Sequence, residues 1–331
     1  MRRTGLVLLA LAVAVAAAAP LLAPHDPGRG YDDYLHAPPT ALHVRDADGR
    51  WRWPFFHPLR LVDRLESRYE EDTSREVALK LFARGSLVAE QDESAGPWLP
   101  LGADSFGRDL YSRILYGARV SLGVALVAVA GSLLIGLVVG GVSGYFGGAL
   151  DELLMRLAEF VVVLPTVYLV LALRSVLPLV LTPGQVFALM VGIFTLVGWP
   201  YVARGVRGIV AVERRRDYAE AARAAGASPV RILCRNILPA TVGHLGIQAT
   251  LLLPAFILAE ATLSFVGVGF FDPTPTWGTM LHDAANVSTL GQFPWMLAPA
   301  FAIFIVVLGV NLVVQGSRTR SVAGSIDLAA R

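Results

Sequence analysis

The chain has 331 residues, of which 55% are hydrophobic and 16% are charged, and its formal net charge is +2 at pH 7. This balance excludes a soluble domain of this length and indicates a chain solvated largely by lipid. The single cysteine, Cys234, excludes an internal disulfide framework and a cysteine-based zinc site.

The only lysine of the chain is Lys80, which lies in the segment EVALKLF with no glycine-rich turn before it. A P-loop needs a lysine directly after such a turn in order to reach the nucleotide phosphates. We therefore expect that the chain is not an enzyme and does not hydrolyse ATP by itself.

Six apolar stretches are long enough for membrane-spanning helices, which need about 20 predominantly apolar residues. In chain order they are Gly5–Ala23, Val120–Val142, Leu157–Leu181, Val186–Val202, Val242–Val268 and Trp295–Val314. Pro165 and Pro178 lie in the third stretch, so a kink or an early end is expected there. The expected fold class is an all-α polytopic membrane protein with six transmembrane helices.

The first stretch has a second interpretation. Arg2 and Arg3, an apolar run and an alanine-rich end also resemble a cleavable signal peptide. The run is long for that purpose, and five remaining spans would place the two ends of the chain on opposite sides. A retained helix over residues 1–23 is the favoured interpretation.

Arginines indicate the orientation, because cytoplasmic loops of membrane proteins carry an excess of Lys and Arg. They gather at the start, between the fourth and fifth stretches, and in the tail: Arg2, Arg3, Arg204, Arg207, Arg214, Arg215, Arg216, Arg223, Arg231, Arg235, Arg318 and Arg320. With six spans these segments share one side, so both termini are expected in the cytoplasm.

The predicted organisation follows from these spans. Residues 24–116 are expected outside, where mixed charges and aromatic clusters favour a small folded element; a partly disordered linker is the alternative. The membrane core covers residues 117–316, with a cytoplasmic loop at about 206–238, and residues 317–331 form a cytoplasmic tail.

The loop before the fifth stretch is predicted to hold two short helices. Asp217–Ala225 consists of strong helix formers, and Gly226 interrupts the run. Ser228 followed by Pro229 is typical of a new helix start, and Pro239 marks the entry to the fifth span. Its alanine face suits the groove of a partner, while an amphipathic loop lying on the membrane surface is the alternative.

Glu220-Ala221-Ala222, three residues, Gly226 and then Ile237-Leu238-Pro239 resemble the EAA motif of ABC importer permeases. The family consensus has isoleucine where this chain has Asn236. The resemblance implies a coupling helix that sits in a cleft of a nucleotide-binding subunit. The residues to which it assigns this ATPase coupling are Asp217, Glu220, Ala221, Ala222, Gly226, Ile237, Leu238 and Pro239.

Two further stretches are similar to the "C"-type permeases of the dipeptide and oligopeptide branch. They are Leu101–Asp109 (LGADSFGRD) and Glu260–Gly269, the latter followed by Pro273–Gly278. The branch usually has threonine where Ala103 stands. Asp104 is expected to cap the helix that follows, and Gly107, Arg108 and Asp109 are expected to support the outer-side structure.

Two charged residues are predicted within the membrane and are therefore candidates for function. Glu260 and Arg174 each lie about 20 residues beyond the expected cytoplasmic end of their spans, which places both about 30 Å across the membrane. They either pair near an outer gate or reach the lipid headgroups separately.

The resemblance implies a type I importer fold in the bacterial inner membrane, with a second homologous permease subunit, two ABC ATPase subunits and an extracytoplasmic binding protein as partners. ATP and Mg are expected to bind to the ATPase subunits, and this chain is expected to bind no cofactor. Membrane lipid is an expected partner, and nucleic acid is not. Di- or oligopeptides are the expected substrate, and nickel or another small solute is the alternative.

Two other classes of protein are possible. A secondary transporter would need inverted repeats in the sequence, which are not evident. A membrane-anchored interaction protein acting through residues 24–100 is the third possibility.

Overall fold

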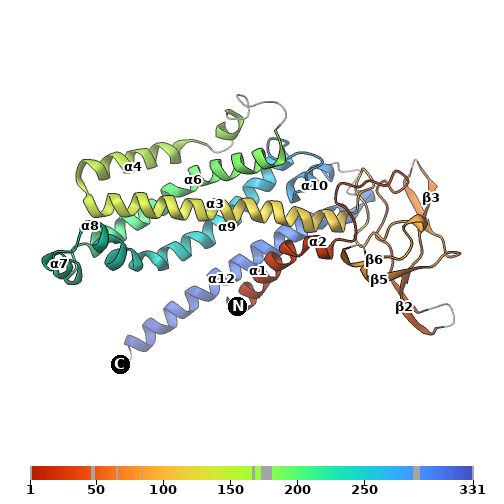
Figure 1. Ribbon diagram of the computed structural model, residues 1–331, viewed down its shortest axis with the longest axis horizontal. Helices are drawn as coiled ribbons and strands as arrows, with labels where there is room; N and C mark the ends of the chain where they lie inside the picture. Colours follow the sequence, from red (N-terminus) through yellow and green to blue (C-terminus); the bar gives the residue numbers. More distant parts are fainter. Residues whose placement is uncertain are drawn as a thin grey trace. The chain divides into compact units, whose positions relative to one another are not determined.

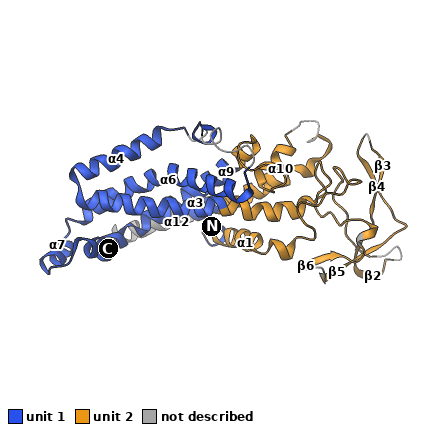
Figure 2. Cartoon of the chain, turned by 45° about the horizontal axis from the view of Figure 1, so that its top comes forward, with its two compact units in different colours: residues 1–5, 124–260, 310–331 blue, residues 6–123, 261–309 orange. Residues whose placement is uncertain are grey.

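The computed structural model describes residues 2–45, 49–64, 66–83, 85–165, 168–172, 181–285 and 291–329. The chain divides into two compact units (Figure 2). Unit 1 contains residues 1–5, 124–260 and 310–331, and unit 2 contains residues 6–123 and 261–309.

Most of the described residues are helical (Figure 1). The α-helices are α1 Arg2–Ala17, α2 Ala19–Leu22, α3 Leu110–Phe146, α4 Gly148–Val163, α6 Pro183–Glu213, α7 Asp217–Ala224, α8 Pro229–Arg231, α9 Val242–Phe265, α10 Trp277–Asp283 and α12 Ala298–Ala329. The π-helical segment η2 (Ile232–Ile237) and the 3-10 turn η3 (Leu238–Thr241) connect α8 to α9, and two further 3-10 turns are η1 (Glu93–Ala95) and η4 (Pro294–Leu297).

Four helical stretches in the described part of the chain are long and apolar enough to cross a membrane. They are Leu110–Phe146, Pro183–Glu213, Pro229–Phe265 and Pro294–Gln315. They coincide with the second, fourth, fifth and sixth predicted spans. Helix α1 is apolar but shorter, and the chain resumes helical structure in α2 with Pro20 in its first turn.

The third predicted span is not one continuous helix. Helix α4 begins at Gly148, earlier than predicted, and ends at Val163, where Leu164 takes an extended conformation. Pro165 explains this end, because the proline ring disfavours helical geometry in the preceding residue. Residues 168–172 are helical again, and 173–180 lie outside the described residues.

The all-α prediction is wrong, because six described segments between His43 and Glu90 form strands. These are β1 His43–Arg45, β2 Trp51–Phe56, β3 Leu59–Asp63, β4 Arg68–Glu71, β5 Val77–Ala83 and β6 Ser86–Glu90. One antiparallel sheet has the order β1-β2-β5-β6, and β3 pairs with β4. A small core of Phe56, Val77 and Leu79 lies under the first sheet, so alternate residues of β5 point inward.

In unit 1, three glycines of α3 allow α6 to approach closely. A Cβ atom at Gly136 would overlap Val202, one at Gly140 would overlap the backbone oxygen of Ala203, and one at Gly144 would lie 2.6 Å from the Arg207 oxygen. Small residues at such a spacing bring two helix backbones together. The glycine stripe therefore serves packing within the chain.

Candidate functional site

Helix α7 follows the end of α6 and is held there by Glu213. The Tyr218 hydroxyl donates a hydrogen bond to Glu213 Oε2 at 2.6 Å, and Arg216 Nε lies 3.8 Å from the same oxygen. Asp217 and Glu220 occupy the first turn of α7 and Arg223 its last, which matches the helix dipole. No sequence motif marks Glu213 or Tyr218, because their pairing depends on the turn between two helices.

Gly226 ends α7 in a left-handed conformation, with φ +77°. Its N–H donates to the Arg223 oxygen at 3.0 Å, and the Ala227 N–H donates to the Ala222 oxygen at 3.1 Å. These two bonds form a Schellman motif, which satisfies carbonyl groups at a helix end. Among the described residues no atom lies within 4 Å of an added Cβ, so the backbone angle, not space, favours glycine here.

The next segment begins as predicted and then departs from the prediction. Ser228 Oγ accepts a hydrogen bond from the Arg231 N–H at 3.4 Å, with Pro229 in the first turn. The predicted separate helix is instead continuous with the fifth span, through η2 and η3. Pro239 lacks the N–H that a regular helix needs, and the local π and 3-10 turns accommodate it.

Of the five residues of α7 and its end that were predicted for coupling, four are exposed, and Ala222 is not. Ala219 is fully buried and Ala222 half-buried, so they face the chain's own packing. We define the α7 face as four of the exposed residues of α7 and its end: Glu220, Ala221, Ala224 and Ala225. Asp217 and Gly226 are also exposed at the two ends of the helix.

The other three predicted coupling residues lie on the segment that leads into α9. Ile237 is fully buried, Leu238 is half-buried beside Gly141, and Pro239 is exposed. They belong to the same unit as the α7 face, but Ile237 and Leu238 point into the chain and act as packing residues.

An ion pair joins α4 to α6 near α7. Arg207 donates to both carboxylate oxygens of Asp151, through Nε at 2.8 Å and Nη2 at 2.5 Å, and Ser143 Oγ donates to the same carboxylate. Arg214 Nη1 donates to the Tyr145 oxygen at 2.7 Å. Arginines that indicate orientation in the sequence therefore also stabilise the turn between α3 and α4.

An open pocket of about 630 Å³ lies beside the ion pair of Arg207 and Asp151. It is lined by Gly148, Asp151, Glu152, Met155, Glu159, Arg204 and Arg207.

In unit 2, Asp104 organises the motif that precedes α3. Its Oδ1 accepts from the Phe106 and Arg108 N–H groups, each at 2.9 Å, and its Oδ2 accepts from Arg108 Nε at 2.7 Å. Gly107 turns the chain with φ +70°, and a Cβ there would overlap the Tyr31 oxygen. Asp104 thus stabilises this turn and does not cap α3, contrary to the prediction.

Two buried arginines bind three carboxylates at this place. Arg108 Nη1 lies 2.7 Å from Asp272 and Nη2 lies 3.7 Å from Asp283, while Arg113 contacts Asp104 at 3.3 Å and Asp272 at 3.2 Å. Burial alone would raise the pKa of Asp272, but the hydrogen bond and charge of Arg108 lower it. Burial, Asp104 and Asp272 raise the pKa of Asp283 to about 6.

Asp109 is the residue that caps α3. It accepts from the Tyr111 N–H at 3.0 Å and the Ser112 N–H at 3.2 Å. It also contacts His25, whose Nδ1 lies 3.2 Å from Asp109 Oδ2 and whose Nε2 lies 3.3 Å from Glu90 Oε1. All three side chains are buried. Burial lowers the pKa of His25, but the two carboxylates outweigh it and raise the pKa to about 9.

Only one of the two predicted intramembrane charges, Glu260, lies in the described part of the chain. Glu260 is fully buried in α9. Arg174 lies outside the described residues, so its pairing with Glu260 stays a prediction.

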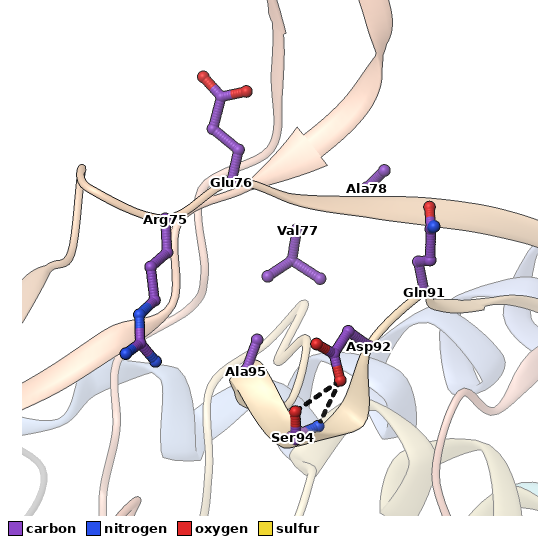
Figure 3. A pocket seen from close by; sticks show the side chains of 8 residues that line it. All are labelled: Arg75, Glu76, Val77, Ala78, Gln91, Asp92, Ser94 and Ala95. Atoms are coloured by element: carbon purple, nitrogen blue, oxygen red, sulfur yellow. Dashed lines mark hydrogen bonds between the residues drawn. The ribbon is translucent and has the colours of Figure 1, made fainter.

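An open pocket of about 470 Å³ lies beside the start of β5 (Figure 3). Its lining consists of Arg75, Glu76, Val77, Ala78, Gln91, Asp92, Ser94 and Ala95. Asp92 accepts from the Ser94 N–H and hydroxyl, and Glu76 points away from Asp92 and pairs with Arg52 at 2.8 Å. Because these polar groups bind one another on an open surface, we assign no ligand to this pocket.

Residues 132–323 match the family described as "Binding-protein-dependent transport system inner membrane component". The chain is similar to the dipeptide transport system permease protein DppC of Bacillus subtilis (37% identity over 67% of this chain and 67% of that protein). It is also similar to the oligopeptide transport system permease protein OppC of B. subtilis (36% identity over 70% of this chain and 73% of that protein). A third relative is the glutathione transport system permease protein GsiD of Pectobacterium atrosepticum (34% identity over 68% of this chain and 72% of that protein).

Proposed function

The chain belongs to the family of inner-membrane components of binding-protein-dependent transport systems, and we propose from this that it is the permease subunit of an ATP-driven ABC importer of di- or oligopeptides. The substrate class comes from the names of the relatives, which are described as dipeptide, oligopeptide and glutathione permeases. A binding protein on the outer side delivers the peptide, and two ATPase subunits bind ATP and Mg.

We propose that the chain crosses the membrane six times with both termini in the cytoplasm. Four described helices are long enough to span. Helix α1 and the segment that begins with α4 supply the other two spans. A second, homologous permease subunit completes the translocation pathway, and residues 24–116 lie on the outer side.

The exposed α7 face carries the proposed coupling role. Helix α7 is tied to the end of α6 through Glu213, and an unbroken helical path runs from Pro229 into α9. When two ATPase subunits close on ATP, they displace α7. Because α7 is joined to two spans, its displacement tilts α6 and α9 and alternates the core between inward-open and outward-open states.

The test is charge reversal and helix disruption on α7. Glu220→Lys and Gly226→Pro should abolish peptide uptake while the complex still assembles in the membrane. The first variant reverses a charge on the α7 face, and the second removes the end of α7, because proline cannot adopt the positive φ of Gly226. Glu152→Lys, an exposed charge reversal on α4, is the matched control and should retain uptake. Survival of both ATPase binding and uptake in the two α7 variants would show that the coupling role is wrong.

Co-purification separates the importer from the other two classes of protein. An importer permease should bring two ATPase subunits and a second permease with it, whereas a secondary transporter or an anchored interaction protein should not. The ligand retained by the cognate binding protein then decides between peptides and a small solute such as nickel.

A further inference from the structure

The β5–β6 hairpin is fastened to the place where the first apolar stretch ends. Ser86 Oγ donates a hydrogen bond to the Ala23 oxygen at 2.8 Å, and both residues are buried. Strand β6 lies beside α2 (Figure 1). Ala83 pairs with Ser86 across the turn, so the tip of the hairpin lies next to the end of the predicted membrane helix.

The side chains at this tip are apolar and exposed. Phe82 is 80% exposed and Leu81 51%, and Leu87 on the opposite strand is also exposed. Leu81 continues the inward face of Val77 and Leu79, but the core ends at Leu79 and leaves Leu81 uncovered. We call Leu81, Phe82 and Leu87 the hairpin tip.

The backbone of Phe82 is strained. Its φ is +54°, in the left-handed region, where a residue with a Cβ pays about 1–2 kcal/mol that glycine would avoid. A bulky aromatic residue in this conformation gains nothing from burial at 80% exposure. No contact of the ring inside the chain offsets this strain in proportion to its size, which makes Phe82 a candidate for a contact outside the chain.

The neighbouring residues indicate which partner this is. Leu21 of α2, two residues before the Ala23 that Ser86 contacts, is 61% exposed, so the helix end to which the hairpin is fastened is also apolar and exposed. Trp53 donates from Nε1 to the Leu79 oxygen at 2.5 Å and is itself exposed, and Lys80 is exposed beside Leu81. Tryptophan and lysine next to apolar side chains are typical of the membrane interface, where the ring meets the headgroups and the ammonium reaches the phosphates.

We propose that the hairpin tip inserts into the headgroup region of the outer leaflet, with Lys80 at the lipid phosphates, and so anchors residues 24–116 to the membrane surface. The proposal rests on the proposed topology, which places this segment outside. An exposed apolar group beside a membrane helix gains free energy when it leaves water for the lipid boundary. That gain offsets the strain at Phe82.

The experiment uses the full complex in lipid nanodiscs, with Cys234 replaced by serine. A polarity-sensitive fluorophore is attached to a cysteine at Phe82, and lipids carrying a spin-label quencher near the headgroup are included. Quenching should be at least about two-fold stronger than for the same probe at Val62, an exposed apolar residue of β3 (40% exposed). A probe at Leu81 should be quenched in the same way.

Two outcomes would overturn the proposal. Equal quenching at Phe82 and Val62 would show that the tip stays in water, and shielding that needs the binding protein would make the tip a protein docking surface. A membrane-impermeant thiol reagent added to intact cells checks the topology separately. If a cysteine in place of Val62 is not labelled from outside, the proposed topology is wrong. Quenching at Phe82 by lipids of the cytoplasmic leaflet would then also contradict the outer-leaflet anchor.

Discussion

At the scale of single residues, the carboxylates around Arg108 and Arg113 differ in what they contribute to stability. Asp104 accepts two backbone bonds and contacts both guanidinium groups. Asp283 lies 3.7 Å from one of them, and its pKa is raised to about 6. A raised acid pKa means that the folded state holds the proton more tightly than the unfolded state, so ionisation of Asp283 above pH 6 opposes folding.

Two variants should therefore behave differently at pH 7. Asp104→Asn should lower the free energy of unfolding by about 1.5–3 kcal/mol, because it removes the carboxylate that contacts both buried arginines through its Oδ2 and leaves Asp272 as the only described carboxylate in contact with Arg113. Asp283→Asn should change it by less than about 1 kcal/mol or stabilise the protein. Thermal unfolding of the purified protein in detergent measures both, and similar losses in the two variants would contradict this account.

His25 should make the stability of unit 2 depend on pH. Its folded-state pKa of about 9 is above the ordinary value of 6.5, so the stabilisation is fully present below pH 6.5 and is lost as pH rises through 9. The loss amounts to at most about 3 kcal/mol. An unfolding midpoint followed from pH 6 to pH 10 should fall, and His25→Gln should remove that part of the slope.

At the scale of elements, the contact between α3 and α6 depends on glycine at defined positions. Gly140→Ala should destabilise the protein by about 1–3 kcal/mol, because the new methyl group overlaps the Ala203 backbone oxygen. Gly192→Ala on α6 is the matched control, since no described atom lies within 4 Å of its added Cβ. The control should be neutral or slightly stabilising by helix propensity. Equal unfolding temperatures for the two variants would refute close packing at Gly140.

At the scale of the whole molecule, the proposed topology gives opposite accessibility to two parts of the chain. Cys234 is exposed in η2, on the proposed cytoplasmic side. A membrane-impermeant thiol reagent should label it in inverted vesicles and not in intact cells. A cysteine at Glu76, in the outer segment, should show the reverse pattern in a Cys234→Ser background. Labelling of both sites from one side would exclude the six-span arrangement.

Four of the six predicted membrane spans and the local turns could be predicted because their causes are local. An apolar run of sufficient length identifies a span, and four such spans coincide with helices of the structure. The end of α7 at Gly226 and the start at Ser228 depend on residues within five positions of each other. The early end before Pro165 has the same local origin.

The polar clusters could not be predicted, because they join residues far apart in the chain. His25 meets Asp109 across 84 positions, and Arg108 meets Asp272 across 164. Asp104 and Asp109 are both suitable helix caps by residue type, and only the path of the chain decides that Asp109 caps α3. Four apolar helices, the arginine pattern and the family motif are thus determined by the sequence itself. The partners of buried charges, the sheet order and the exposed hairpin tip were decided by tertiary structure, because each depends on which distant segments meet.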